Sequence, residues 1–332
     1  MNSQILENKY ILLFSQYFFG YENKIKRKME EMGAKVDLFD EMSVKSMFDR
    51  ALLKVSSELF VKKTEIYYTD ILKKIKDKKY DYILFIDCET PTEGILKIFK
   101  DNFRQAKFCL HMWDSISNLK GVSLKFKYFD YITTFDRNDA EEYGITLRPL
   151  FFCDEYRANN INDNCEYDLS FIGTIHSDRY GVLKKIIDNT DKMSLKMFFY
   201  PFLQSKFIYY FYKVTKKDFR NASIKDFKFD KLSSDDIANV IKKTRTIIDI
   251  QHPKQSGLTM RTLEIVGMKK KIITTNSDIV NYDFYNENNI AIIDRKSPLI
   301  DKNFINSPYI ELDLAIYEYY SIKKWCLDVL GV

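Results

Sequence analysis

The sequence predicts an α/β protein of two domains, each a parallel sheet flanked by helices. Short apolar runs that read as strands alternate with helical stretches along the whole chain, which is the pattern of parallel sheets. The chain has 332 residues, more than a single hydrophobic core usually supports. The polar, asparagine-rich run at 154–164 has no periodicity and is the best candidate for a linker between the halves.

In the first half, expected at 1–153, a strand, a helix ended by Gly33 and a second strand form one βαβ unit. Apolar residues between 44 and 78 then recur at helical spacing and predict one or two long helices. Strands are expected at 10–14, 35–39, 82–86, 107–111 and 131–134, and the first helix at 22–32.

The second half, expected at 165–311, repeats the alternation, and a tail follows at 312–332. Strands are expected near 169–172, 194–199, 246–250, 271–275 and 290–293, with helices between them.

Composition limits the classes of function. A hydrophobic content of 45% can supply two cores, and the net charge of +5 is spread along the chain, which gives little support to nucleic-acid binding. There is no H-E-x-x-H or C-x-x-C spacing, so no metal and no bound cofactor are expected. The amino terminus lacks the features of a signal peptide. The cysteines are odd in number and lie mostly in apolar runs, as in reduced, cytoplasmic proteins: Cys88, Cys109, Cys153, Cys165 and Cys326.

The segment 244–293 carries the clearest chemistry. A strand leads into a polar loop closing on Ser256-Gly257, and the next helix carries Arg261 and Glu264 on one face. Such a junction lies at the carboxyl end of a parallel strand, where backbone N–H groups and the helix dipole attract a phosphate. An arginine and a glutamate one turn apart could hold a diphosphate and a vicinal diol, as a nucleotide sugar presents. The alternative is an ordinary α/β unit with a surface ion pair.

A second junction of this kind lies at 167–181. A buried strand ends at Gly173-Thr174, and Arg179 falls near the start of the next helix. The alternative to a phosphate ligand is that Arg179 pairs with Asp178 or Asp191.

These segments resemble the donor-binding half of glycosyltransferases of the B fold (GT-B). In that family a glutamate on the helix binds the nucleotide ribose and is followed by a glycine and a strand reading K-x-I-I-T, matched here by Glu264, Gly267 and 271–274. The spacing from Gly173 to Arg179 also matches, although Thr174 stands where commoner members have arginine, and Arg179 where they have lysine.

The resemblance implies two Rossmann-like domains facing across a cleft, with the donor bound by the second and the acceptor by the first. It also implies that the last helix, 317–330 with Trp325, returns to pack on the first domain. The expected donor-binding residues are Gly173, Thr174, His176, Arg179, His252, Ser256, Gly257, Thr259, Arg261 and Glu264.

The three histidines, His111, His176 and His252, each fall at or just after the end of an expected strand. Because α/β folds bind ligands at that edge, the coincidence favours one shared cleft. Each histidine taken alone is more often structural.

The acceptor side is less specific. Asp114 follows the strand that ends at His111 and is the first candidate for a general base, with His111 the second. Asp87 and Glu89 follow the preceding strand, and their carboxylates could also approach a reacting sugar. The alternative is that Asp114 and Ser115 cap a helix beginning near Ile116.

The resemblance therefore implies a hexosyltransferase-type glycosyltransferase that moves a sugar from a nucleotide-sugar donor to a glycan or lipid-linked glycan. Its place would be bacterial surface polysaccharide synthesis, of capsule or lipopolysaccharide. A nucleotide-sugar epimerase of the same fold and a non-catalytic binding protein stay open.

The aromatic run 198–214 is followed by lysines, a composition that suits a membrane interface. The alternative is a helix that packs on its own domain. The expected location is the cytoplasm, with peripheral contact at the inner face of the membrane as a further reading.

Overall fold

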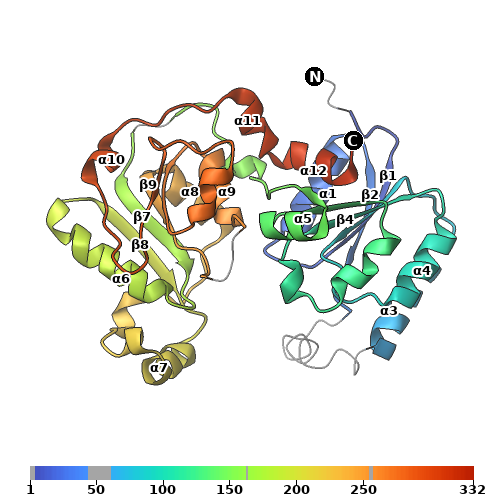
Figure 1. Cartoon of the computed structure of the whole chain (residues 1–332), viewed down its shortest axis with the longest axis horizontal. Helices are drawn as coiled ribbons and strands as arrows, with labels where there is room; N and C mark the ends of the chain where they lie inside the picture. Colours follow the sequence, from blue (N-terminus) through green and yellow to red (C-terminus); the bar gives the residue numbers. More distant parts are fainter. Residues whose placement is uncertain (1–3, 44–60, 162–163, 254–256) are drawn as a thin grey trace. The chain divides into compact units, whose positions relative to one another are not determined.

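The computed structural model describes residues 4–43, 61–161, 164–253 and 257–332. The chain divides into two compact units, both of the α/β class (Figure 1). Unit 1 comprises Met1–Pro149 and Ile322–Val332, and unit 2 comprises Leu150–Ser321. The polar run expected as a linker therefore lies within unit 2. Among the described residues, no helix has the length and apolar character needed to cross a membrane.

Unit 1 contains a six-stranded sheet in the order β2-β1-β3-β4-β5-β6, and every neighbouring pair is parallel. Its strands are β1 (Tyr10–Ser15), β2 (Lys35–Asp40), β3 (Tyr82–Ile86), β4 (Lys107–Met112), β5 (Tyr131–Thr134) and β6 (Thr146–Leu147). The first five confirm the expected strands. β6 is too short to leave an apolar pattern in the sequence.

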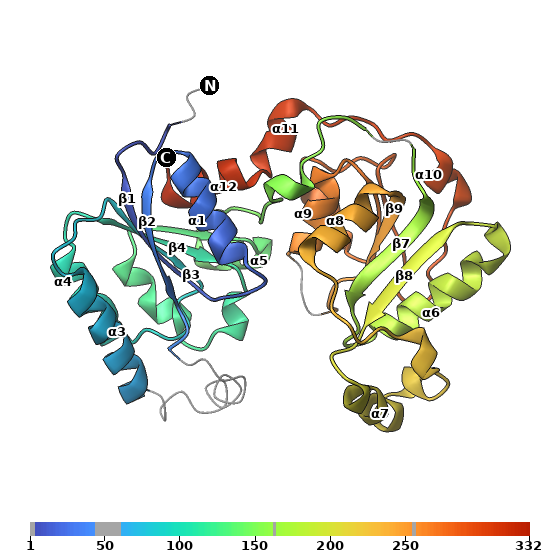
Figure 2. The ribbon, with the colours of Figure 1, turned by 180° about the vertical axis from the view of Figure 1, so that it is seen from behind.

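Helices cover both faces of this sheet. They are α1 (Tyr21–Glu31), α3 (Val61–Ile75), α4 (Glu93–Asn102), α5 (Arg137–Tyr143) and α12 (Ile322–Leu330). Helices α1 and α12 pack side by side on one face, and α3 and α4 lie together on the other (Figure 2). The helical pattern at 44–78 is confirmed by α3 from residue 61 onward; 44–60 lies outside the described residues. Under α3 and α4, the rings of Phe14 and Phe85 stack at 4.4 Å.

Unit 2 contains a five-stranded parallel sheet in the order β11-β10-β9-β7-β8. Its strands are β7 (Tyr167–Thr174), β8 (Met197–Phe202), β9 (Thr244–Asp249), β10 (Lys271–Thr274) and β11 (Ile290–Ile292). All five were expected, but β8 begins three residues later than predicted. Ser194 adopts a left-handed conformation with φ of 53°, which ends the preceding turn, and the edge position of β8 accommodates Pro201.

The helices of unit 2 are α6 (Arg179–Thr190), α7 (Lys206–Thr215), α8 (Ser234–Lys242), α9 (Met260–Gly267), α10 (Lys302–Asn306) and α11 (Leu314–Tyr319). Residues 150–158 pack closely against the end of α9. A Cβ atom added at Gly267 would lie 2.5 Å from Cγ of Phe152 and 2.8 Å from the carbonyl oxygen of Tyr156. Glycine at this position therefore allows two backbone segments to approach each other.

Candidate functional site

The carboxyl ends of the parallel strands in unit 2 meet at one edge of the sheet. β7 and β9 are neighbours there, and β10 pairs with the other side of β9. The loop after β7 leads to Arg179, the loop after β9 contains His252, and helix α9 begins just beyond it. The sheet order thus brings the two sequence segments with predicted donor residues to the same edge.

The first direct contact between these loops is a pair of histidines. The rings of His176 and His252 lie 5.5 Å apart with an interplanar angle of 32°. Burial, and next the charge of Arg179, lower the pKa of His176 to about 4. His176 is therefore neutral at pH 7. His111 belongs to unit 1, so the grouping of all three histidines stays a prediction.

Arg179 is the first residue of α6 and lies against the end of β7. Its Nη1 donates a hydrogen bond of 2.7 Å to the carbonyl oxygen of Thr174, while its buried Nε has no partner among the described residues. Burial lowers the pKa of Arg179. An added Cβ at Gly173 would make only an ordinary contact with Nη1 of Arg179, at 3.5 Å, and a tighter one with Cζ of Phe171, at 3.1 Å.

Asp178 does not take Arg179 as its ion-pair partner in the part of the chain that the structure describes. It instead accepts two hydrogen bonds from Nη1 of Arg295, at 2.9 and 3.1 Å. Nη2 of Arg295 donates to the carbonyl oxygen of Gln251 at 2.5 Å, so Arg295 joins the loops after β7, β9 and β11. Sequence reasoning missed Arg295. The available signal was a basic residue two positions beyond an expected strand end.

Helix α9 is tied to the end of β9. Thr259 caps the helix by accepting from the amide of Thr262, and the Thr262 hydroxyl donates to Oδ2 of Asp249 at 2.5 Å. Gly257 lies just before the cap and is buried, while Ser256 lies outside the described residues. The predicted turn-to-helix junction is therefore present from Gly257 onward.

Arg261 and Glu264 form an ion pair, with Nη1 of Arg261 2.7 Å from Oε2 of Glu264. The pair is not a surface pair, because the Glu264 side chain is 3% exposed and that of Arg261 is 23% exposed. Taking a carboxylate out of water is costly unless it is paired, and the guanidinium of Arg261 supplies that partner. Burial, followed by this carboxylate, raises the pKa of the neighbouring Tyr156 phenol.

Three guanidinium groups thus come from three separate segments. The charges of Arg295 and Arg261 both contribute to lowering the pKa of Arg179, while the carboxylate of Asp249 opposes them. The carboxylates of Asp178 and Glu264 are paired with two of these arginines. The amino ends of α6 and α9 lie beside the group and favour an anion. Guanidinium groups at helix amino ends are suited to a diphosphate, and the role of these residues in donor binding stays a prediction.

His111 of unit 1 lies in β4 and is fully buried at 0% exposure. Its Nδ1 lies 2.9 Å from the Thr133 hydroxyl, and its ring packs edge-on against Trp325 at 5.0 Å. Burial, and next the charge of Arg148, lower the pKa of His111 to about 3. In this conformation His111 is a neutral, enclosed side chain.

Asp114 lies in the loop after β4 and is partly exposed. Its Oδ1 accepts hydrogen bonds from the Ser115 amide at 2.9 Å and from Nδ2 of Asn118 at 2.8 Å. The residues that follow form a short 3₁₀ turn, Ile116–Asn118, where the sequence suggested a helix. Both bonds end on Oδ1, and the role of Asp114 as base stays a prediction.

Asp87, directly after β3, combines burial with an unusual backbone. Asp87 and Cys88 have φ values of 66° and 85°, which is uncommon outside glycine. Oδ1 of Asp87 accepts from the amides of Trp113 at 2.6 Å and Asp114 at 3.0 Å. Burial raises the pKa of Asp87 to about 7, so this carboxyl group titrates near neutrality. The sequence places Asp87 after a strand but does not distinguish it from Glu89.

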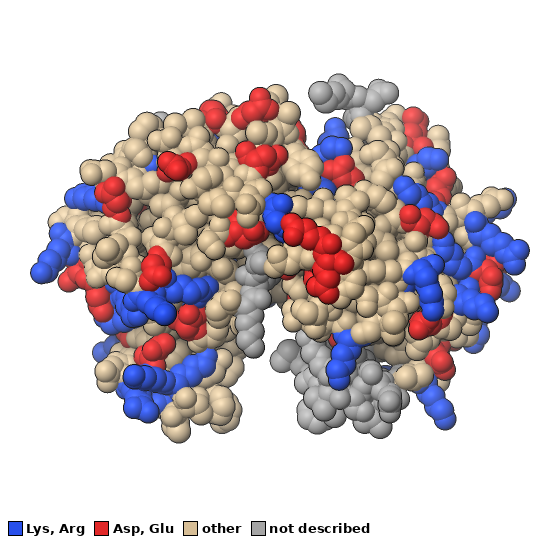
Figure 3. Space-filling model, viewed as in Figure 1, with Lys and Arg blue, Asp and Glu red and all other residues tan. Residues whose placement is uncertain are grey.

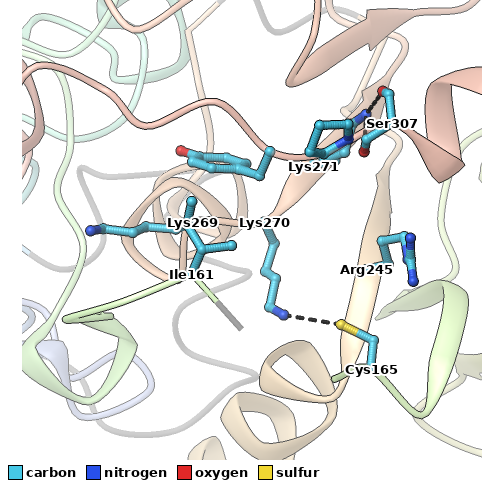
Figure 4. Close-up of a pocket in the computed structure, with 9 residues that line it drawn as sticks. Ile161, Cys165, Arg245, Lys269, Lys270, Lys271 and Ser307 are labelled. Atoms are coloured by element: carbon cyan, nitrogen blue, oxygen red, sulfur yellow. Dashed lines mark hydrogen bonds between the residues drawn. The ribbon is translucent and has the colours of Figure 1, made fainter. Parts of the chain in front are cut away.

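A basic cavity lies at the opposite edge of the unit 2 sheet, at the starts of β9 and β10 (Figure 4). Its volume is about 30 Å³, room for one or two water molecules. Its lysines already have protein partners: Lys270 lies 3.4 Å from Sγ of Cys165, and Lys271 lies 3.1 Å from the carbonyl oxygen of Ser307. This cavity is too small for a nucleotide.

Across the described residues, no group of three or more His, Cys, Asp or Glu side chains is placed to hold a metal ion.

No family model matches the sequence. No curated protein matches it either. Among solved structures, the UDP-GlcNAc 2-epimerase of Methanocaldococcus jannaschii, in complex with UDP-GlcNAc and UDP, is similar with a TM-score of 0.51 and 11% identity over 97% of this chain and 98% of that chain. HepE of Anabaena, in complex with UDP-glucose, has a TM-score of 0.56 and 9% identity over 96% of this chain and 98% of that chain.

The catalytic domain of starch synthase IV from Arabidopsis thaliana, bound to ADP and acarbose, has a TM-score of 0.50 and 8% identity over 98% of this chain and 95% of that chain. Identities this low establish the fold alone. With its two parallel-sheet units, the chain has the GT-B fold of two Rossmann-like domains, which glycosyltransferases and nucleotide-sugar epimerases share.

Proposed function

We propose that the chain is a nucleotide-sugar-dependent glycosyltransferase that acts on a glycan or lipid-linked glycan in bacterial surface polysaccharide synthesis. The observation that carries the proposal is the carboxyl edge of unit 2. Arg179, Arg261 and Arg295 supply positive charge there, and α9 presents a buried carboxylate, Glu264, beside them.

On this proposal the donor diphosphate lies at the amino end of α9 and against Arg179 and Arg261. Glu264 accepts hydrogen bonds from the ribose hydroxyls. The Arg261–Glu264 ion pair suits a site that is alternately empty and occupied, because each buried charge keeps a partner while the donor is absent. His176, His252 and Thr259 belong to the wall of the same site.

The acceptor is proposed to bind unit 1, with Asp114 as the general base that takes the proton from the acceptor hydroxyl. His111 is the second candidate, and its complete burial means that it must first become exposed. In a retaining reaction no such base is needed. Stabilisation of the departing diphosphate by Arg179 and Arg261 then carries the chemistry.

A nucleotide-sugar epimerase is the second candidate, because an epimerase is among the similar structures. The two activities differ in one requirement. An epimerase converts the nucleotide sugar without an acceptor, whereas a glycosyltransferase releases the nucleoside diphosphate stoichiometrically with a new glycosidic bond. Chromatography of the reaction products with and without a glycan acceptor separates them.

Glu264→Ala tests the donor site. A thermal-shift panel of nucleoside diphosphates and nucleotide sugars first identifies the ligand that stabilises the protein. Losing hydrogen bonds to a charged group costs on the order of 1.5–3 kcal/mol, so Glu264→Ala should weaken that ligand roughly ten- to hundredfold.

Glu287→Ala, which removes an exposed carboxylate from the same unit, is the control and should bind as the parent does. Equal donor affinity in Glu264→Ala and the parent would show that Glu264 does not hold the ribose.

A further inference from the structure

Helix α7 of unit 2 presents an unusual apolar surface to solvent. Phe207, Tyr210, Phe211 and Val214 are 78%, 60%, 54% and 83% exposed. Their spacing of three, four and seven residues places all four on one stripe of the helix. We define these four residues as the α7 stripe. An exposed contiguous apolar patch of this kind marks an interaction surface.

The opposite face of α7 is already occupied by its own unit. Tyr209 is buried, its hydroxyl donates to the carbonyl oxygen of Ala222 at 3.0 Å, and its ring lies 5.6 Å from that of Phe227. Lys213 donates to the same carbonyl oxygen at 2.6 Å. One face of α7 thus packs on unit 2, and the other face is exposed to solvent. The expectation that α7 packs on its domain is correct, and it leaves the α7 stripe unexplained.

Positive charge surrounds the stripe. The segment from Lys206 to Lys231 contains eight lysines and arginines and three aspartates, a net charge of +5, which equals the net charge of the whole chain. Figure 3 shows basic side chains on the lobe that carries α7, beside an uncharged tip. Its exposed basic residues are Lys206, Lys217, Arg220, Lys225, Lys228 and Lys231.

We propose that α7 docks the protein on an anionic lipid bilayer. Aromatic and aliphatic side chains of the stripe enter the boundary between headgroups and acyl chains, and the surrounding lysines and arginines contact anionic headgroups. The charge also disfavours a second copy of this chain as the occupant, because two segments of +5 would repel each other. This proposal is independent of the donor chemistry.

The orientation of α7 fits such a surface. It follows β8 and lies beyond the carboxyl ends of the unit 2 strands (Figures 1 and 2). Nζ of Lys216, one residue after the helix, donates to the carbonyl oxygen of Ser177 at 3.0 Å, within the loop that also contains His176. Helix α7 is therefore attached to the loop after β7, at the carboxyl edge of the unit 2 sheet.

Sedimentation of the full chain with vesicles tests the proposal. We expect binding to phosphatidylcholine vesicles that contain about one third phosphatidylglycerol and much weaker binding to phosphatidylcholine alone, with a loss at high salt. The double substitution Phe207→Ser and Phe211→Ser should weaken binding at least roughly tenfold, since two buried aromatic side chains are lost.

The matched control is Leu299→Ser with Leu314→Ser, which removes two side chains that are 72% and 71% exposed but lie outside the α7 segment. This control should bind vesicles as the parent does. Equal loss in both double variants, equal binding to neutral and anionic vesicles, or no binding to either would overturn the proposal.

A second measurement keeps the three aromatic residues of the α7 stripe and places a fluorescent probe beside them. In Val214→Trp, the new indole should shift its emission to shorter wavelength when anionic vesicles are added, because it leaves water. The two native tryptophans, Trp113 and Trp325, belong to unit 1 and supply the background measured on the parent protein. An unshifted emission, or dimerisation that depends on Phe207 and Phe211 without vesicle binding, would assign the stripe to another occupant.

Discussion

Buried carboxyl groups behave differently according to whether a cation accompanies them. Glu264 lies beside Arg261 and forms an ion pair with it. Glu41 of unit 1 is fully buried, and its Oε1 accepts from the Thr90 amide at 2.6 Å, while Oε2 has no partner among the described residues. Burial raises the pKa of Glu41 to about 8. A neutral carboxyl group at pH 7 is therefore expected in unit 1, and an ion pair in unit 2.

Glu41 should make the stability of unit 1 fall with rising pH. Its folded pKa of about 8 lies above the ordinary value of 4.5 that applies to the unfolded chain. Between these two values the folded state holds a proton that the unfolded state has lost. The free energy of unfolding consequently falls as pH rises through this window and levels off above it.

Glu41→Gln cannot ionise, so it should lose less stability than the parent between pH 5 and pH 8, by up to about 3 kcal/mol. Urea unfolding followed by tryptophan fluorescence measures this, because both tryptophans lie in unit 1. Glu141→Gln, at an exposed site, is the control. Identical pH profiles for Glu41→Gln and the parent would show that Glu41 is ionised when folded.

Asp114→Asn separates local structure from catalysis. Oδ1 of asparagine can still accept from the Ser115 amide, so the loop after β4 should stay folded. If Asp114 is the base, kcat should fall by something like 10² to 10⁴ while donor affinity is kept. Asn118→Ala removes only a hydrogen bond to Asp114 and should stay active. Near-parental turnover of Asp114→Asn would leave Asp87 as the next carboxylate to test.

At the scale of elements, neighbouring strands and close helix contacts determine which residues can form a site. β7 and β9 are adjacent although their starts, at residues 167 and 244, are 77 positions apart in the sequence, and this pairing brings His176 to His252. On the other side of α9, residues 150–158 pack so closely that position 267 has no room for a methyl group. The helix that carries Arg261 and Glu264 is thus held from both sides.

Gly267→Ala should destabilise unit 2 by about 1–3 kcal/mol, because the new Cβ would overlap the Phe152 ring and the Tyr156 carbonyl oxygen. Gly94→Ala in α4 is the matched control: its Cβ would meet only the Thr92 hydroxyl, at 3.7 Å. The control should be neutral or slightly stabilising. Calorimetry of both variants measures the difference, and an unchanged unit 2 transition in Gly267→Ala would contradict the packing argument.

At the scale of the whole molecule, the periodicity of apolar residues was sufficient to predict both parallel sheets. β1 (YILLFS) and β3 (YILFI) contain continuous apolar runs, as burial on both faces requires. The two-residue β6 and the start of β8 were outside the reach of such patterns. The propensities of the individual residues do not predict such strands, because the position of these strands depends on pairing with their neighbours.

Sequence patterns were sufficient to predict where the candidate site lies, but not which side chains contact one another there. Strand ends and helix starts identified the loops that carry Arg179, His252 and Arg261. The partners of these residues depend on strand order, which periodicity does not encode. For this reason the Arg295–Asp178 pair was missed, and the burial of the Arg261–Glu264 pair was not anticipated.

The assignment of α12 to unit 1 has a consequence during protein synthesis. Trp325 in α12 is fully buried and packs on His111 of β4, so part of the first unit's core is encoded after the whole of unit 2. On the ribosome, all residues of unit 2 emerge before α12 does. The unit that begins first therefore completes its core last, and until then the surface that α12 covers on β4 is exposed to chaperones.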